Sequence, residues 1–394
     1  MLPRVVLKPR AERRLRRGHR WLYSNEIDTR HSAMADLEPG QAVLVYDARE
    51  KLLGSAFIDR RALRCGRLYS RNAELLDGPT ITARLRNALA WRERCYPSAS
   101  YRMVYGDADW LPGLVVDRYG DYLVVQASAE GMRQLVPQVV DALQALLAPR
   151  GIVVRMEADE TLTTVEDQAS EQQLVGEMPD RVALIENGVE FLAPLREGQK
   201  TGWFYDHRES RARLQDWASG ANVLDVFSYI GGWGLQLLHA GAATLCAIDS
   251  SAAAIDCLRE QPVARLHAGS IRTLNSTAVE AMKSLVVEGA RYDIVVLDPP
   301  AFIKRQRDQE KGEQAYHRIN QLALKLLAPR GLLVSASCSM HLAADRLSSI
   351  VATAAHKADR DVAMVYRGGL GFDHPVLPAI PETDYLKAIF ARID

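Results

Sequence analysis

The C-terminal half of the 394-residue sequence predicts a doubly wound α/β fold. From about residue 186, apolar strand-like runs such as NVLDVF (222–227) and DIVVLDPP (293–300) alternate with helix-like runs. Strands that are apolar throughout, with helices between them, indicate a parallel sheet covered on both faces. Two further strand-like runs, joined by a Pro-rich link within residues 361–394, predict an antiparallel pair at one side of this sheet.

The N-terminal half predicts two smaller parts. Residues 1–72 contain short β-like runs, a hairpin turn in YDAREK and one Arg-rich segment, which together predict a small β-barrel-like domain. Residues 73–185 predict a central mixed α/β domain with a β-hairpin about residues 119–121 and a helix that ends at Gly151. Residues 186–394 then form the third domain.

Composition favours a soluble globular protein, with 48% hydrophobic and 25% charged residues. No apolar run is long enough to predict a membrane-spanning helix, and the N-terminus lacks the apolar segment of a secretory signal, so we expect a cytoplasmic protein. The cysteines are scattered without a C-x-x-C pair, which argues against a zinc site or a disulfide framework. We expect no metal, and four of the five cysteines to be structural: Cys65, Cys95, Cys246 and Cys257.

Charge is unevenly distributed, although the formal net charge is zero. Residues 1–71 hold 16 Lys/Arg and 8 Asp/Glu, a net of +8, and the remainder carries −8. A cluster of cations gains free energy from releasing phosphate counterions, so a polyanion such as RNA is a candidate partner. A solvated basic face is the alternative.

The stretch VLDVFSYIGGWG (223–234) predicts a cofactor site. Asp225 lies in the first strand of the sheet, and Gly231 lies in the turn to the following helix. Asp249 ends the next strand, where an acidic residue binds a ribose diol in nucleotide-binding folds. The G-x-G-x-x-G spacing that holds dinucleotide phosphates is missing. S-adenosylmethionine (SAM), which has a ribose but no phosphate, therefore fits better than NAD; a structural turn is the alternative.

Two more residues lie at predicted strand ends. Asp298 is followed by two prolines, which stop the strand and fix the carboxylate at the sheet edge, where it can accept hydrogen bonds from a nucleobase. Cys338 follows the apolar run GLLVSAS. Taken alone, it is most simply a small buried hydrophobe, but beside Asp298 and the cofactor turn it becomes a candidate nucleophile.

Four motifs in this order along the chain are similar to the large-subunit ribosomal RNA cytosine-5 methyltransferase I family: GDADWLPGLVVDRYGDYLVVQ, GQKTGWFYDHRESR, LDPPAF and SCSMH. The resemblance covers essentially the whole chain. It implies an N-terminal PUA RNA-binding domain, a central α/β domain and a Rossmann-like, seven-stranded, SAM-dependent methyltransferase domain. The partner implied is RNA, bound by a monomer or a homodimer.

The resemblance also assigns residues. It implies that Cys338 is the nucleophile that attacks cytosine C6 and that Asp298 holds the base. The cofactor-binding positions that it implies, Ser270 being one where relatives usually have an acidic residue, are Lys200, Phe204, Tyr205, Asp225, Ser228, Gly231, Asp249 and Ser270. In the basic N-terminal domain the candidate RNA contacts are Arg13, Arg14, Arg16 and Arg17.

Some points stay open in the sequence. The group that removes the C5 proton is not assigned; its candidates are His341, Glu382, Asp384 and a water molecule. Two other functions remain alternatives. One is methyl transfer to a base nitrogen through the Asp298 motif, which needs no cysteine. The other is an RNA-binding ribosome-assembly protein with a non-catalytic methyltransferase domain, for which Ser270 is the only hint.

Overall fold

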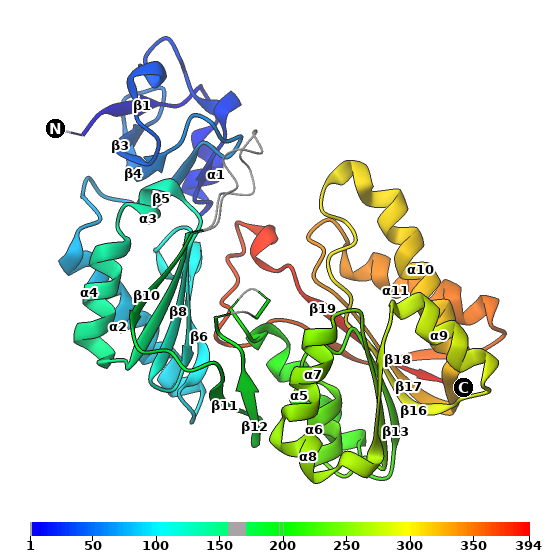
Figure 1. Ribbon diagram of the computed structural model, residues 1–394. Coiled ribbons are helices and arrows are strands. Elements are labelled where there is room, and N and C mark those ends of the chain that lie inside the picture. Colours follow the sequence, from blue (N-terminus) through cyan, green and yellow to red (C-terminus); the bar gives the residue numbers. More distant parts are fainter. Residues whose placement is uncertain (1, 157–170, 197, 200) are drawn as a thin grey trace. The chain divides into compact units, whose positions relative to one another are not determined.

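The computed structural model describes residues 2–156, 171–196, 198–199 and 201–394 (Figure 1). Contacts divide the chain into two compact units. The first unit comprises residues 1–184, 193–203 and 372–383, and the second comprises residues 185–192, 204–371 and 384–394. The boundaries predicted at residues 72 and 185 remain predictions.

The first unit begins with a five-stranded sheet in the order β1-β3-β4-β5-β2. The predicted hairpin is present, because β3 and β4 are antiparallel neighbours on either side of the turn at residues 47–51. The Arg-rich segment forms the short helix α1 (Glu12–Arg16), whose Leu15 is buried among the strands. The strands are β1 (Arg4–Val6), β2 (Trp21–Leu22), β3 (Gln41–Tyr46), β4 (Leu52–Ile58) and β5 (Gly66–Ser70).

The second layer of this unit is a five-stranded sheet in the order β10-β9-β8-β7-β6, packed against α2 (Gly78–Cys95) and α4 (Val136–Leu147). Only the β8–β9 pair is parallel; the other three pairs are antiparallel. The predicted hairpin about residues 119–121 joins β7 to β8. The strands are β6 (Ser100–Tyr105), β7 (Leu114–Tyr119), β8 (Tyr122–Ala127), β9 (Gly151–Met156) and β10 (Glu171–Gly176).

The predicted helix end at Gly151 is wrong. α4 stops at Leu147, where Ala148 takes a left-handed conformation with φ 43° and caps the helix. Gly151 instead begins β9, opposite Gly176. A Cβ on Gly151 would lie 2.1 Å from the carbonyl oxygen of Glu177, so the glycine permits a close backbone approach in the sheet.

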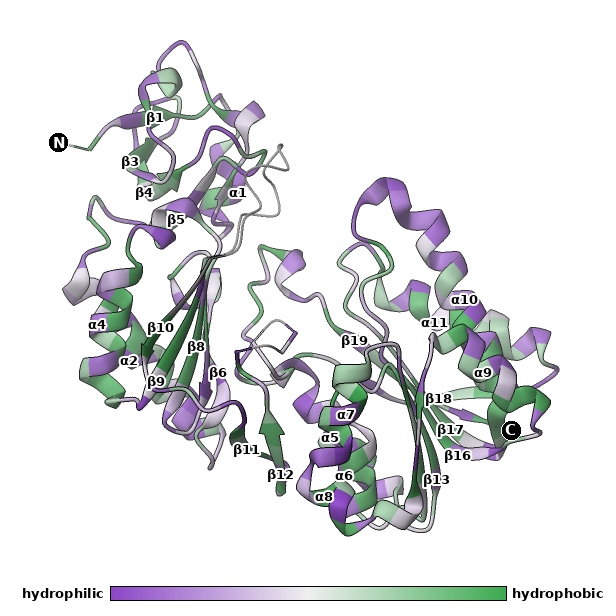
Figure 2. Ribbon diagram, viewed as in Figure 1, coloured by the Kyte–Doolittle hydropathy of each residue, from purple (hydrophilic) through white to green (hydrophobic). Residues whose placement is uncertain are grey.

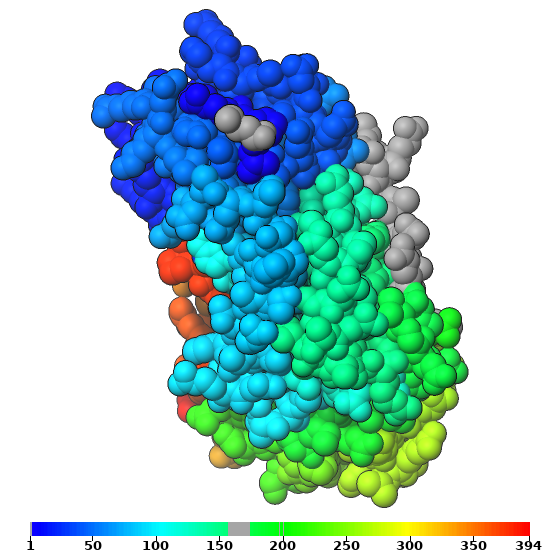
Figure 3. Space-filling view, turned by 90° about the vertical axis from the view of Figure 1, so that its left-hand side faces the viewer, coloured from blue at the N-terminus to red at the C-terminus, as the bar shows by residue number. Residues whose placement is uncertain are grey.

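The two sheets of the first unit share a packed boundary. Phe57 of β4 belongs to the same hydrophobic cluster as the second sheet, and a Cβ on Gly131 would lie 2.3 Å from its ring. The indole Nε1 of Trp21 donates a hydrogen bond of 2.9 Å to Asp107. The space-filling view shows the N-terminal residues in blue and the central residues in cyan as one continuous surface (Figure 3).

The second unit contains a seven-stranded sheet in the order β15-β14-β13-β16-β17-β19-β18. β15 through β17 run parallel, and β19 is antiparallel to both of its neighbours, as the sequence predicts. The strands are β13 (Asn222–Val226), β14 (Thr244–Asp249), β15 (Ile271–Asn275), β16 (Tyr292–Leu297), β17 (Leu327–Ser337), β18 (Val362–Gly368) and β19 (Lys387–Ile393).

Helices cover both faces of this sheet (Figure 1). One face packs against three helices that share a hydrophobic cluster with the strands: α9 (Ala278–Val287), α10 (Gln309–Leu326) and α11 (Ala344–Lys357). The other face carries α5 (Arg208–Leu214), α6 (Gly234–His239), α7 (Ala252–Glu260) and α8 (Pro262–Leu266). Hydropathy follows this arrangement, with hydrophobic central strands and a hydrophilic start to α10 (Figure 2).

One strand of the seven-stranded sheet was not predicted. β15 lies at the edge of the sheet, where none of its five residues is fully buried, and its sequence has no continuous apolar run. A hairpin about Asn187 consists of β11 (Val182–Glu186) and β12 (Val189–Ala193), and the boundary between the units falls within it. Among the described residues, no helix has both the length and the apolar character needed to span a membrane.

Candidate active site

The candidate site lies at the carboxyl edge of the seven-stranded sheet. Asp225 pairs in register with Val296 of β16, which places Asp298 just past the end of its strand beside the end of β13. Leu297 pairs with Ser335 of β17, so the strand that carries Cys338 ends at the same edge. Parallel strands therefore bring the predicted cofactor turn, Asp298 and Cys338 to one edge of one sheet.

Asp225 is fully buried in β13. Its Oδ2 accepts a hydrogen bond of 2.8 Å from the backbone N–H of Gly234, which fixes the start of α6. Its Oδ1 is also buried and has no hydrogen-bond partner among the described residues. Burial raises the pKa of this carboxyl to about 7, against the opposing hydrogen bond from Gly234. A buried acceptor without a donor is the expected state of a site that awaits a ligand.

The turn after β13 has an unusual backbone. Phe227 and Tyr229 both adopt the left-handed region, with φ values of 67° and 48°. Gly231 follows with φ 90°, and a Cβ there would lie 2.6 Å from the side chain of Leu235. Strained non-glycine residues concentrate at functional sites, where the surrounding structure holds them in place. Ser228, inside this turn, is buried and its Oγ has no partner among the described residues.

Asp249 joins the turn to the next strand. Its Oδ2 accepts a hydrogen bond of 2.9 Å from the backbone N–H of Tyr229, and its Oδ1 accepts one of 2.9 Å from that of Ser251. Each carboxylate oxygen keeps a further lone pair for a hydroxyl donor. Ser270 lies in a short 3₁₀ turn directly before β15 and is partly exposed.

The predicted segment GQKTGWFYDHR is placed in part. Lys200 lies outside the described residues. The ring of Phe204 packs edge-on against Tyr229 of the cofactor turn, with centroids 5.6 Å apart. Tyr205 is buried, and the guanidinium of Arg208 lies 5.0 Å from the centre of its ring. Phe204 thus borders the turn, whereas Tyr205 is part of the packing behind it.

Asp298 is held by two residues that the sequence reasoning did not single out. The Nε2 of His207 lies 3.1 Å from Oδ1, and the indole Nε1 of Trp233 donates a hydrogen bond of 3.0 Å to Oδ2. The His207 and Trp233 rings also contact each other, with centroids 5.1 Å apart. The Asp298 side chain keeps 22% of its surface exposed, so it is fixed in direction and still open on one side.

The charges of this pair support each other. Burial opposes ionisation of Asp298, but the charge and hydrogen bond of His207, with that of Trp233, outweigh it and lower the pKa of the carboxyl. Burial likewise disfavours the imidazolium, and Asp298 overcomes this and raises the pKa of His207. The pair therefore favours the ionised form of Asp298 and the charged form of His207.

The Ser337-Cys338-Ser339 turn is built from side-chain hydrogen bonds. The buried hydroxyl of Tyr316 lies 2.8 Å from Ser337 Oγ and 3.0 Å from Ser339 Oγ. Ser339 Oγ also accepts a hydrogen bond of 3.2 Å from the backbone N–H of Ile303. The two serines point inward and fix the turn, while Cys338 between them is only partly buried, and its Sγ lies 4.0 Å from the carbonyl oxygen of Pro299.

Lys387 provides a cation next to this turn. It stands directly opposite Ser337 in the β17–β19 ladder, and its Nζ donates to the carbonyl oxygens of Ser339 at 2.6 Å and Tyr385 at 2.9 Å. Burial lowers the pKa of Lys387 to about 8, against the opposing charge interaction with Cys338. A buried ammonium that interacts with a thiol favours the thiolate form of that thiol.

The remaining predicted residues are more scattered. Arg14 forms an ion pair with Glu26, and Arg16 forms one with Asp47, whereas Arg13 and Arg17 are exposed on the same helix and the residue after it. Of the other cysteines, Cys65, Cys246 and Cys257 are buried and Cys95 is half-buried.

The candidate bases lie in different places. His341 is partly exposed, three residues after Cys338, and Asp384 is exposed in the second unit. Glu382 belongs to the first unit.

Two missed residues carried a signal in the sequence. Lys387 begins the run KAIFARI and is followed by four apolar residues, as in a buried strand, so a cation at this position needs a polar partner. Trp233 lies inside the cofactor turn motif itself. His207 lies inside the quoted motif GQKTGWFYDHRESR, but that motif does not show that its partner is Asp298, which is 91 positions away.

The residues at this edge fit SAM. Two buried oxygens have no hydrogen-bond partner among the described residues: Asp225 Oδ1 and Ser228 Oγ. The amino-acid group of SAM provides hydrogen-bond donors that such oxygens require. Asp249 has spare acceptor capacity for a ribose diol. No cluster of three potential metal-binding side chains occurs among the described residues.

The profile of the S-adenosylmethionine-dependent methyltransferase family matches residues 86–388, and that of a PUA-like domain matches residues 5–71. A curated relative, ribosomal RNA large subunit methyltransferase I of Cronobacter sakazakii, is 31% identical over 400 residues and covers 100% of both chains. The protein of the same name from Salmonella typhimurium is 30% identical and covers 99% of this chain and 98% of that protein.

Solved structures show the same fold. A protein of Streptococcus mutans described as a SAM-dependent methyltransferase superposes with a TM-score of 0.84 at 20% identity, covering 99% of this chain and 100% of that one. A methyltransferase structure complexed with SAH superposes with a TM-score of 0.83, also at 20% identity and with the same coverage.

Proposed function

Because the chain belongs to the large-subunit ribosomal RNA methyltransferase I family of SAM-dependent enzymes, we propose that it methylates C5 of a cytosine in large-subunit ribosomal RNA. The observation that carries this proposal is the placement of a partly exposed thiol, Cys338, beside a buried cation and one strand from the ionised Asp298. Transfer to a base nitrogen needs an acceptor such as Asp298 but has no use for the cysteine turn.

The first step is activation of the base. The thiolate of Cys338 adds to C6 of cytosine, forming an S–C6 bond, and the electron pair of the C5=C6 double bond becomes available at C5. Lys387 favours the thiolate before attack, and the Tyr316-Ser337-Ser339 hydrogen bonds fix the direction of the thiol. Asp298 accepts hydrogen bonds from the cytosine amino group or the protonated ring nitrogen, which stabilises the charge that develops on the ring.

Bound SAM would supply an electrophilic methyl group, which C5 would accept through its electron pair while the sulfonium–methyl bond breaks and neutral S-adenosylhomocysteine is left. Asp225, Ser228 and Asp249 would hold the cofactor at the carboxyl edge, beside the Phe204 ring. A base then removes the C5 proton, the C5=C6 double bond re-forms, and the S–C6 bond breaks with its electrons returning to sulfur. Cys338 is regenerated as the thiolate, so the cycle is balanced in atoms and electrons.

The basic N-terminal part supplies RNA binding in this proposal. Arg13 and Arg17 are exposed and available for phosphate contacts, and Arg14 and Arg16 would exchange or share the acidic partners that they have here. Ribosomal RNA as substrate rests on the relatives that carry that name.

Tritium release separates this reaction from its alternatives. Methyl transfer to C5 breaks the C5–H bond, whereas transfer to a base nitrogen leaves it intact, so with RNA that carries tritium at cytosine C5 we expect at least one tritium released to water for each methyl group incorporated. Methyl incorporation without tritium release would replace the proposal by base-nitrogen transfer. RNA binding with neither SAM binding nor methylation would leave a non-catalytic RNA-binding protein.

A further inference from the structure

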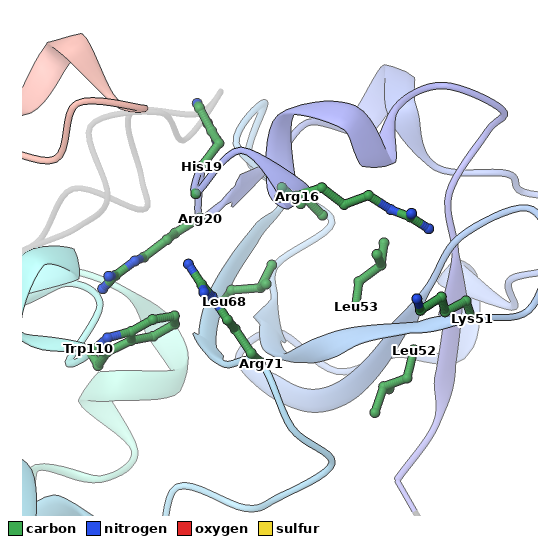
Figure 4. A pocket seen from close by; sticks show the side chains of 11 residues that line it. Arg16, His19, Arg20, Lys51, Leu52, Leu53, Leu68, Arg71 and Trp110 are labelled. Carbon is green, nitrogen blue, oxygen red and sulfur yellow. The ribbon is translucent and has the colours of Figure 1, made fainter.

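The first unit contains a cavity of about 220 Å³ where its two sheets meet (Figure 4). This is far more than the roughly 15 Å³ that one water molecule needs. Its wall comes from the end of α1 and the segment after it, from the start of β4, the end of β5, and Trp110 of the central layer. The cavity therefore joins the β-barrel-like domain to the central domain.

Cations surround an apolar floor in this pocket. In Figure 4, Arg20, Arg71 and Trp110 gather at one end, Arg16 and Lys51 lie at the other, and leucine side chains are drawn between them. The Trp110 ring lies 3.4 Å from the guanidinium carbon of Arg20 and 5.8 Å from that of Arg71. The leucines that line the pocket are Leu15, Leu52, Leu53 and Leu68.

Two of these cations are not neutralised. Lys51 and Arg71 are exposed, and neither side chain has an ion-pair partner within the parts of the chain that the structure describes. Lys51 directly precedes β4 and Arg71 directly follows β5, so two strand ends fix their positions. Arg16, by contrast, is paired with Asp47 at 2.5 Å.

Arg20 gives independent evidence of a ligand-binding site in this pocket. Its side chain is buried, with 8% of the residue exposed, and one guanidinium nitrogen donates to the carbonyl oxygen of Asp107. Its Nε is buried without a partner among the described residues. Burial, with the nearby charge of Arg71, lowers the pKa of Arg20 to about 10 against the opposing charge of Asp107. A buried donor in an electropositive pocket is best satisfied by an anion.

We propose that this pocket binds a backbone phosphate of the RNA substrate, with the base of the same nucleotide against the leucines and Trp110. Lys51 and Arg71 contact the phosphate oxygens, and the buried Arg20 lends its field to the same group. An unstacked base provides the flat apolar surface that the floor accepts. The pocket lies within the first unit, whereas Cys338 belongs to the second.

The inference rests on RNA being the substrate in the proposed function, but its test does not need catalysis. The full-length protein without SAM is titrated into a fluorescein-labelled single-stranded RNA, and anisotropy is recorded from about 0.05 to about 0.3 M salt. The Lys51→Gln/Arg71→Gln variant removes two phosphate contacts. We expect the slope of log K against log salt to fall by about 1.4, with a roughly 10- to 30-fold loss of affinity near 0.1 M salt.

The matched control is Arg49→Gln/Arg60→Gln, which removes two exposed cations of the same domain that do not line the pocket. We expect it to bind RNA within about threefold of the wild type, because neither side chain lines the pocket. Equal losses in the two variants would mean diffuse attraction, and wild-type binding by the Lys51/Arg71 variant would mean an unused pocket. Either result overturns the inference.

A second arm identifies the ligand. Inorganic phosphate and cytidine monophosphate are added as competitors at constant ionic strength, and neither should displace the RNA at micromolar concentration. Displacement by phosphate alone at that concentration would make this a small-anion site and overturn the assignment to RNA. Because SAM is absent throughout, loss of C5 chemistry in the tritium assay and loss of pocket-dependent RNA binding are separate outcomes.

Discussion

At the predicted cofactor turn, Asp225 is buried, one of its oxygens has no hydrogen-bond partner among the described residues, and its pKa is raised to about 7. At the neighbouring strand end, Asp298 is also largely buried, yet His207 and Trp233 hold it and its pKa is lowered. Two aspartates at one sheet edge thus have pKa values that are shifted in opposite directions. Burial alone disfavours a carboxylate, and the local donors decide whether the chain itself or an incoming ligand must compensate.

The contrast separates two tasks. In the proposed function, Asp225 gains a hydrogen-bond donor from the cofactor, whereas Asp298 is charged before any ligand binds and holds the base. Cys338 resembles Asp298 in this respect, because the chain itself supplies a cation, Lys387, that interacts with it. Substitutions that remove a donor or a charge should therefore have different effects in the two regions.

The largest effect is expected from Asp298→Asn. The amide cannot carry the charge that stabilises the activated ring, so we expect kcat for methylation to fall by roughly 100- to 1,000-fold. SAM affinity should stay within about threefold, because the cofactor residues are untouched. Steady-state kinetics and calorimetric SAM binding check both numbers. A variant that loses SAM binding and keeps kcat would place Asp298 on the cofactor side of the comparison.

His207→Gln tests the ion pair through stability. A raised imidazole pKa stabilises the fold fully below the unfolded value near 6.5, and this contribution is lost as pH rises through the folded pKa. The lowered pKa of Asp298 stabilises above about 3.8 and is lost as pH falls through its folded value.

Between about pH 4 and 6.5 both contributions are present, so there we expect the variant to lose about 3 kcal/mol of unfolding free energy. The loss should shrink at higher pH. Urea unfolding at several pH values measures it, with the exposed His267→Gln as control. A loss that does not change with pH would show that His207 acts by packing.

Asp225→Asn tests the unpartnered oxygen. Losing one charge-assisted hydrogen bond should weaken SAM binding by roughly 10- to 100-fold. In the wild type a cationic group beside Asp225 would lower its pKa from about 7, so binding at pH 6.5 should release protons and should weaken as pH falls. Calorimetry in two buffers of different ionisation enthalpy counts these protons, and the exposed Asp256→Asn serves as control. Binding without proton release would contradict the role of Asp225.

Lys387→Met should have the smallest effect. We expect the alkylation of Cys338 by iodoacetamide at pH 7 to slow about three- to tenfold, because the thiolate loses its cation. The difference from the wild type should disappear as pH rises through about 8, where Lys387 becomes neutral. Peptide mass spectrometry isolates the rate at Cys338 from the other cysteines, and Lys325→Met is the exposed control. Equal rates at pH 7 would remove Lys387 from the account.

Much of the second unit's fold could be predicted, because its sheet is buried. Apolar runs such as those of β13, β14, β16 and β17 are typical of strands in a parallel sheet that is covered on both faces. The parts that failed lie at edges and ends. β15 is a half-exposed edge strand without an apolar pattern, and the end of α4 depends on a left-handed alanine that no helix-stop residue announces.

The candidate site shows the same division. Asp298 and Cys338 follow strands, so sequence pattern and topology together bring them to one edge. His207 lies in a quoted motif, but its role could not be predicted, because its contact with Asp298 joins residues that are far apart in the sequence. Lys387 could have been predicted as a site residue, because a cation next to an apolar strand segment needs a polar partner when it is buried.

The most direct test of the central claim is covalent trapping. RNA containing 5-fluorocytosine is incubated with SAM and either the wild type or Cys338→Ala. Fluorine at C5 cannot leave as a cation, so the S–C6 bond persists after methyl transfer. The account predicts a denaturation-resistant protein–RNA adduct in the wild type, mapped by mass spectrometry to Cys338, and none in the variant. Methylation of natural RNA by both proteins without any adduct would contradict it.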